Sequence, residues 1–152
     1  MSINEIEQQI VEEFSIFDNW MDKYQYIIDL GKSLPIIDEA AKKEENLIKG
    51  CQSRVWLDCK TEDIPAEEIA AADGEKVRLV FSADSDAIIT KGIISLLIRV
   101  YNHQTPKEIL KSDLSFIDEI GLKSNLSPTR ANGLVSMIKQ IKLYALAFEE
   151  KD

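Results

Sequence analysis

Residues 53–60 have the sequence SRVWLDCK, in which apolar residues alternate with polar or bulky ones: Val55, Leu57 and Cys59 against Arg54, Trp56 and Asp58. Residues 75–82, EKVRLVFS, repeat this alternation. A period of two is typical of a β-strand with one buried face. Asp73-Gly74 directly precedes the second run and favours a turn. The sequence therefore predicts an antiparallel hairpin whose connection, at about residues 61–75, is unusually long.

Helical patterns lie on both sides of this hairpin. Before it, Ser2-Ile3-Asn4-Glu5 forms a capping box, and a second helix is expected from near Asp18 to Gly31. After it, we expect a central buried helix capped by Ser85 or Asp86 and ending near Tyr101. Two more helices are expected to begin at Thr105-Pro106 and at Ser127-Pro128. The fold class is α+β, with a small antiparallel sheet packed against several helices in one domain, residues 1–152.

Composition narrows the classes of function. The chain has 152 residues, is 45% hydrophobic and carries a net charge of −9. This charge argues against nucleic acid as a partner, because backbone binding requires Lys and Arg. No apolar run approaches the roughly 20 residues of a membrane span, and the acidic N-terminal segment lacks the features of a signal peptide. We expect a cytoplasmic protein without a membrane partner.

Few residues could support metal or redox chemistry. One histidine and two cysteines, Cys51 and Cys59, do not supply the ligands of a zinc site or an iron–sulfur cluster, and there is no CxxC pair. Eight residues apart on a strand, the two cysteines would lie roughly 26 Å from each other, too far for a disulfide. We expect free thiols and no metal.

Cys51 is the remaining candidate for chemistry. It follows Gly50, which permits backbone conformations that other residues avoid, and it precedes Gln52-Ser53 at the start of a strand. A thiol at such a loop can be presented to another molecule, or it can be a small half-buried residue. Cys59 lies on the apolar face of its strand and is expected in the core. A catalytic pair of Cys51 with His103 stays open, although His103 at a helix end more often serves that terminus.

Three stretches carry a resemblance to a known family: NLIKGCQSRVWL (46–57), SADSDAIITKGIISLL (82–97) and LSPTRANGLVSMI (126–138). Together with LGKSLPII (30–37), they resemble the SufE/CsdE family of cysteine desulfurase sulfur acceptors, from about Ile6 to Phe148. The resemblance implies a SufE/IscU-like fold and a carrier that binds no cofactor. Such a carrier takes persulfide sulfur from a pyridoxal-phosphate cysteine desulfurase (SufS/CsdA-like), stimulates it, and delivers the sulfur to an iron–sulfur scaffold (SufBCD-like). By the same resemblance, residues 61–75 are an insertion relative to the short hairpin connection common in the family.

The resemblance also assigns roles to residues. Cys51 matches the sulfur acceptor, Gly50 is expected in the hinge of its loop, and Asp86 and Arg130 match positions close to the loop. Gln52 and Ser53 are expected to hydrogen-bond the loop backbone. We expect the loop to hold its sulfur in an apolar pocket and to swing out toward the desulfurase. Alternatively, the chain is a non-catalytic module that regulates a desulfurase by contact alone.

Overall fold

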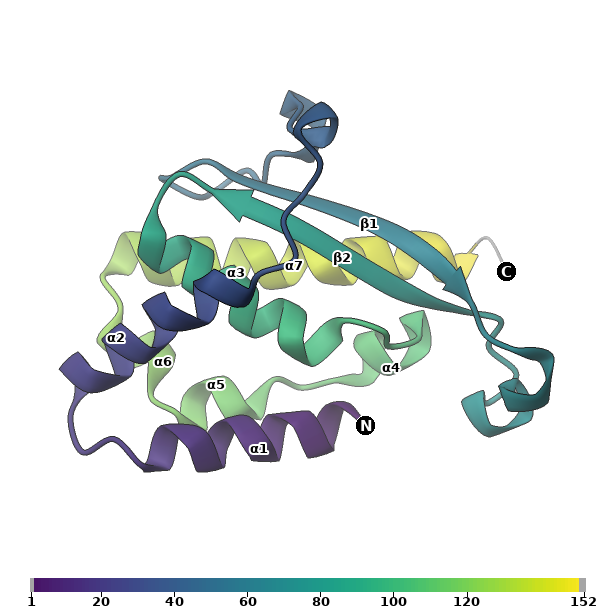
Figure 1. Cartoon of the computed structure of the whole chain (residues 1–152), viewed down its shortest axis with the longest axis horizontal. Helices are drawn as coiled ribbons and strands as arrows, with labels where there is room; N and C mark the ends of the chain where they lie inside the picture. The colour runs from purple at the N-terminus through teal and green to yellow at the C-terminus, as the bar shows by residue number, and fades with distance from the viewer. Residues whose placement is uncertain (1, 151–152) are drawn as a thin grey trace.

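A hairpin of two long strands forms the upper layer of the protein (Figure 1). In this computed structural model, which describes residues 2–150, β1 (Val55–Asp63) and β2 (Val77–Ser85) pair antiparallel over their whole length. The hairpin and the α+β class are confirmed, although each strand begins two residues later than the pattern suggests. The connection contains two short 3-10 helices, η4 (Ala66–Glu68) and η5 (Ala70–Ala72), and turns at Asp73-Gly74, both with positive φ.

Helices cover one face of the hairpin. The central helix α3 (Ile88–Tyr101) is buried along most of its length and packs on β2, on α7 (Pro128–Glu150), on α2 (Trp20–Leu30) and on α1 (Ile3–Ser15). The remaining helices are short: α4 (Pro106–Lys111), α5 (Ser115–Glu119) and α6 (Leu122–Asn125). In Figure 1, α7 runs along the hairpin and α1 lies on the far side of α3. The inner face of the hairpin therefore closes the core.

Local signals account for most helix ends. The capping box at Ser2 is present, Thr105 caps α4 with Pro106 in the first turn, and Ser127 Oγ accepts a hydrogen bond from the Arg130 amide at the start of α7. The second helix begins near Asp18 as expected, with Asn19 as its cap. The predicted cap of α3 is wrong: Ala87 occupies the cap position without a side-chain hydrogen bond.

Residues 36–48, which we call the arch, cross the outer face of the hairpin. The arch contains two 3-10 helices, η2 (Glu39–Ala41) and η3 (Glu44–Asn46), joined by irregular chain. At its start, the Ile37 amide donates to the Ala83 carbonyl of β2 at 3.1 Å. At its end, the Ile48 amide donates to the Val55 carbonyl of β1 at 2.8 Å. The arch is thus anchored to both strands, and it leads directly into the segment that holds Cys51.

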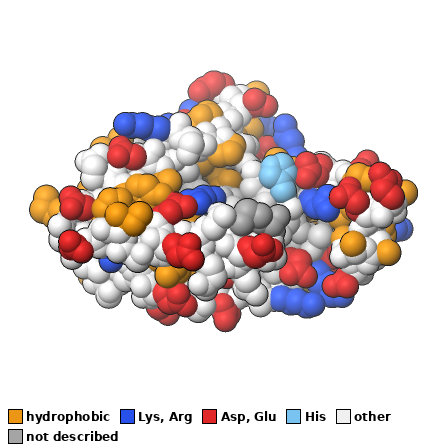
Figure 2. Space-filling view, turned by 60° about the horizontal axis from the view of Figure 1, so that its bottom comes forward, with side chains coloured by type: hydrophobic (Ala, Val, Ile, Leu, Met, Phe, Trp, Pro, Cys, Tyr) orange, Lys and Arg blue, Asp and Glu red, His pale blue; other side chains and the backbone are white. Residues whose placement is uncertain are grey.

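Acidic side chains are scattered over the surface (Figure 2). Figure 2 shows Asp and Glu side chains spread over the visible face, interrupted by Lys and Arg and by patches of hydrophobic side chains. This dispersal fits the solvated acidic surface that the composition predicts. Within residues 2–150, none of the helices is both long enough and apolar enough to cross a membrane.

Candidate functional site

Cys51 lies in the loop of residues 49–54, whose two ends are fastened together. Leu47 forms an antiparallel bridge with Trp56, and the adjacent hydrogen bond from Ile48 to Val55 closes the neck of the loop. The loop departs from this neck through Gly50, whose φ is 96°. A Cβ at Gly50 would lie 2.4 Å from Ser136 Oγ of α7. The positive φ favours glycine here, and a larger residue would also have to displace the Ser136 hydroxyl.

The Cys51 side chain is turned inward, against α7. Its Sγ lies 3.6 Å from the carbonyl oxygen of Gly133, to which the thiol donates. A Cβ on Gly133 would be 3.4 Å from this sulfur, so a helical glycine gives the sulfur room to approach the helix backbone. A cavity of about 80 Å³ adjoins the thiol. Its lining comes from the loop, α3 and the first turns of α7: Cys51, Gln52, Ser53, Thr90, Ile93, Thr129, Arg130, Gly133 and Met137.

This location has an electrostatic consequence for Cys51. Burial raises the pKa of its thiol above the ordinary value, because the low-dielectric surroundings disfavour the thiolate. Lys49 and Arg54 are the nearest cations in sequence, but neither causes a shift in this pKa that offsets burial. At neutral pH the thiol is protonated in this inward position. A nucleophilic thiolate therefore requires a change of surroundings, such as movement of the loop.

Asp86 anchors the end of the loop at which β1 begins. Its Oδ1 accepts a hydrogen bond from the Arg54 amide at 3.1 Å, and the Asp86 amide donates to the Arg54 carbonyl at 3.3 Å. Ser85 Oγ donates to the same carbonyl at 2.8 Å. These contacts explain why neither Ser85 nor Asp86 caps α3: both side chains are engaged by Arg54.

The other residues proposed to support the site also lie at the loop. Gln52, Ser53 and Arg130 line the same cavity as Cys51. Arg130 is exposed, and its Nη1 donates to Tyr24 Oη at 3.3 Å, which connects α7 with α2. Trp56 is on the outer face of β1, where it forms the antiparallel bridge with Leu47 and lies under Lys42 of the arch.

Cys59 lies apart from this site. It is a free thiol on the inner face of β1 with 9% of its surface exposed, which confirms its expected place in the core. Burial, with the nearby charge of Asp58, raises the pKa of Cys59 to about 12. This thiol is therefore protonated and shielded, and it takes no part in the chemistry of the loop.

The position of His103 decides the open question of a catalytic pair with Cys51. The His103 amide donates to the Leu79 carbonyl, and Leu79 pairs with Thr61 of β1. Thr61 lies roughly 20 Å along the strand from the neck of the Cys51 loop at Val55, at about 3.3 Å per residue. His103 Nδ1 is instead 2.9 Å from Glu62 Oε1. A catalytic pair of Cys51 and His103 is therefore wrong for this fold.

A larger hollow of about 440 Å³ lies elsewhere, between α1, η1 (Gly31–Ser33) and the end of α3. His103 belongs to its lining, together with Arg99 and Asn102. Arg99 is engaged by Glu13, and Asn102 Oδ1 accepts from the Phe81 amide. Cys51 thus lines the smaller cavity and not this hollow.

Sequence reasoning missed several residues of the site. Thr90, Ile93 and Met137 line the cavity, and Gly133 and Ser136 contact the loop from α7. Gly133, within the predicted last helix, is a signal that could have been used. A glycine inside a helical pattern often marks a close approach of another group. The other residues resemble ordinary core or surface positions, and only the fold brings them to Cys51.

Comparisons with known proteins identify the family of the chain. Residues 8–145 match the family described as SufE, Fe-S metabolism associated domain. An uncharacterised SufE-like protein of Rhizobium meliloti (strain 1021) is 38% identical over 135 residues, covering 88% of this chain and 90% of the relative. One from Rhizobium etli is also 38% identical over 135 residues, covering 88% of this chain and 85% of the relative.

A solved structure supports the fold independently. The solution structure of a hypothetical protein from Thermus thermophilus superposes with a TM-score of 0.67 at 20% sequence identity, covering 93% of this chain and 94% of that one. The family match spans most of the chain and includes the loop of Cys51, both anchoring strands and α7 up to residue 145. The chain therefore belongs to the SufE family, which is associated with iron–sulfur metabolism.

Proposed function

We propose that this protein accepts sulfur on Cys51 as a persulfide from a pyridoxal-phosphate cysteine desulfurase and delivers it to iron–sulfur cluster assembly. The observation that carries the proposal is a single thiol in a loop with a closed neck, held beside a small cavity. The partners are a SufS/CsdA-like desulfurase and a SufBCD-like scaffold. This protein stimulates the desulfurase, because removal of the persulfide sulfur frees the enzyme for another turnover.

The transfer step is a thiol exchange. The Cys51 thiolate attacks the outer sulfur of the desulfurase persulfide, a new S–S bond forms at Cys51, and the S–S bond in the desulfurase breaks. The desulfurase cysteine leaves as a thiolate, and the proton of Cys51 passes to solvent or to that leaving group. One sulfur atom moves, and no external oxidant or reductant is consumed.

The inward position of Cys51 suits storage rather than attack. The cavity of about 80 Å³ beside Sγ has room for one additional sulfur atom. Since burial raises the pKa of Cys51, the inward thiol is unreactive until the loop moves. Gly50 provides the conformational freedom for this movement, while Asp86 keeps the far end of the loop fixed. Gln52, Ser53 and Arg130 form the surroundings of the stored sulfur.

The insertion at residues 61–75 lies at the opposite end of the hairpin from the Cys51 neck. We therefore assign it no part in the sulfur chemistry. Its role in the proposal is to adjust contacts with a partner.

Intact-protein mass spectrometry tests the proposal. The protein is incubated with a cysteine desulfurase and free cysteine without reductant, and an added mass of about 32 Da, one sulfur atom, is expected. Cys51→Ser should remove the added mass, while Cys59→Ala, the matched control at the other thiol, should retain it. Stimulation of the desulfurase that survives in Cys51→Ser would instead support the regulatory binding module.

A further inference from the structure

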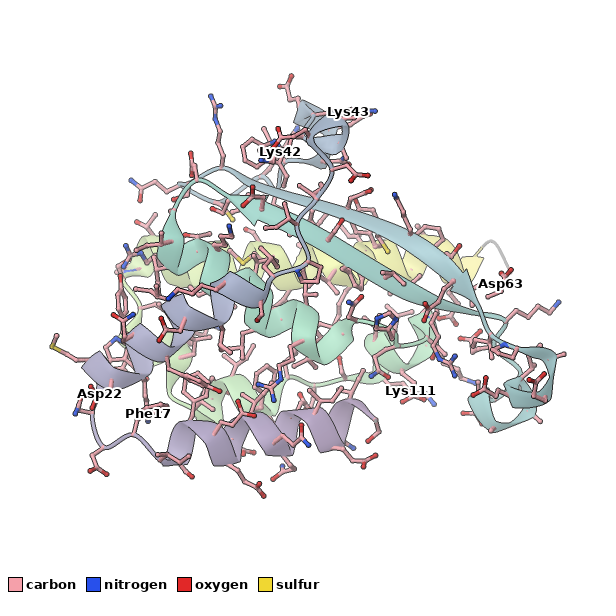
Figure 3. All side chains as sticks on the ribbon, viewed as in Figure 1. Phe17, Asp22, Lys42, Lys43, Asp63 and Lys111 are labelled. Atoms are coloured by element: carbon pink, nitrogen blue, oxygen red, sulfur yellow. The ribbon has the colours of Figure 1, made fainter. Side chains whose placement is uncertain are left out.

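Lys42 fastens the middle of the arch to the hairpin. Its Nζ lies 2.8 Å from Asp84 Oδ2 and 5.3 Å from the centroid of the Trp56 ring. Trp56 and Asp84 are paired across β1 and β2, on the outer face, because their neighbours Val55 and Ala83 are buried on the inner face. One ammonium group therefore contacts both strands. In Figure 3, Lys42 lies on the hairpin side of the arch and Lys43 on its outer side.

Asp84 extends this connection to the helical layer. Its other oxygen, Oδ1, lies 3.5 Å from Lys91 Nζ of α3. Lys91 directly follows Thr90, which lines the cavity beside Cys51. Lys42, Asp84 and Lys91, which we call the bridge, thus join the arch, the hairpin and α3 at one carboxylate.

The bridge is partly withdrawn from solvent. The side chains of Lys42 and Asp84 are 20% and 16% exposed, whereas those of the nearby pair Lys60–Asp38 are 71% and 80% exposed. Burial raises the pKa of Asp84, but hydrogen bonds from Lys42 and the Ser85 amide and the charge of Lys91 outweigh it and leave the pKa below its ordinary value. The carboxylate is therefore ionised, and solvent screens the bridge less than an exposed pair.

We propose that the bridge is a positioning device that restrains the Cys51 loop in its inward position. The arch runs from Lys42 through Leu47 and Ile48, the residues that close the neck, into Gly50 and Cys51. With the bridge intact, the arch is fixed at its middle as well as at its two ends, so the neck has little freedom. With the bridge broken, the contacts at the two ends and the exposed Lys60–Asp38 pair remain, and the loop opens more often. If the restraint also controls sulfur transfer, that role rests on the proposed function; the restraint of the loop itself does not.

Labelling of Cys51 with iodoacetamide, followed by mass spectrometry of peptides, tests the bridge. Lys42→Met retains a long side chain over Trp56 but removes the charge, and we expect Cys51 to be labelled about fivefold faster. Lys42→Arg should restore the slow rate. Lys43→Met is the matched control, because Lys43 pairs with Glu45 at the exposed surface, and its rate should equal that of the unmodified protein.

Cys59 provides an internal reference in the same experiment, because it is buried in the core. A parallel rise in the labelling rate of Cys59 would show that the whole fold has loosened. That result would overturn the proposal that the bridge acts locally on the Cys51 loop. An unchanged Cys51 rate in folded Lys42→Met would overturn the proposal as well. Labelling requires no desulfurase, so it tests the restraint by the bridge alone. Sulfur uptake by Cys51 is tested separately by the added mass, and the failure of one proposal is therefore distinguished from the failure of the other.

Discussion

The Cys51 thiol donates to the carbonyl oxygen of Gly133 across a distance of 3.6 Å, so a loop residue and a helix backbone are in direct contact. The contact spans 82 positions in the sequence. A Cβ at Gly133 would just touch the sulfur, so a larger side chain there would crowd the position in which the sulfur rests. Gly133 can therefore be used to displace the sulfur without changing the loop.

Gly133→Val should push Cys51 outward. Its Cβ would lie 3.4 Å from Sγ, and the two methyl groups of valine would extend further into the site. We expect faster labelling of Cys51 with iodoacetamide and little loss of stability, because glycine is itself unfavourable within a helix. Asn132→Val, at the exposed neighbouring position, should leave the labelling rate unchanged. Slow labelling in Gly133→Val would contradict the inward position.

Cys51 should become reactive at a higher pH than a free cysteine does. Because burial raises its pKa, the thiolate forms only as the pH rises above the value of about 8.5 typical of free cysteine. The labelling rate of Cys51 is measured in a Cys59→Ala background from about pH 6.5 to about pH 10.5. The pH at which this rate is half-maximal should be higher in the folded protein than in the same protein unfolded in urea, where it should be roughly 8.5. A midpoint at or below that of the unfolded protein would mean that the thiolate is stabilised.

Gly50→Ala should release the loop. The new Cβ would meet Ser136 Oγ at 2.4 Å, and alanine at φ 96° is strained by roughly 1–2 kcal/mol. Thermal unfolding and Cys51 labelling measure the two effects, and we expect lower stability together with faster labelling. Gly74→Ala separates the causes, because Gly74 also has positive φ but a Cβ there meets no atom within 4 Å. This control should lose stability without any change at Cys51.

Asp86→Ala should loosen the start of β1. The Arg54 amide loses its acceptor, and hydrogen bonds to charged groups contribute about 1.5–3 kcal/mol. Amide hydrogen exchange at Arg54 should become at least about tenfold faster, since about 1.4 kcal/mol corresponds to a factor of ten. Asp86→Asn keeps an acceptor oxygen and should exchange at a rate closer to that of the unmodified protein. Equal exchange in all three proteins would show that Asp86 does not anchor the loop.

The sequence predicts those parts of the fold that depend on local chemistry. The alternation around Leu57 and Phe81 predicts the hairpin, and the caps at Ser2 and Thr105 predict helix starts, because these signals act within a few residues. The predicted cap of α3 is wrong because Ser85 and Asp86 bind Arg54, more than thirty positions away. Local patterns do not reveal such competition.

In the candidate site, too, some features are predicted by local sequence and others arise only from tertiary packing. The motif around Gly50 and Cys51 identifies the loop and the conformation of its glycine. The resting position of the thiol depends on Gly133 and Met137 of α7, which only tertiary packing brings to the loop. The arch is a further example: its polar sequence indicates an irregular segment, while the pairing of Lys42 with Asp84 is visible only in the folded chain.

The closed neck of the Cys51 loop limits how far sulfur can travel. Cys51 follows Ile48 by only three positions, and a fully extended chain spans at most about 3.6 Å per residue, so the tip reaches roughly 10 Å from the neck. On the proposed function, donor and recipient must both bring their reacting groups within this radius. Two large proteins cannot occupy so small a region together. Sulfur delivery would then proceed by alternation, with the desulfurase leaving before the scaffold docks.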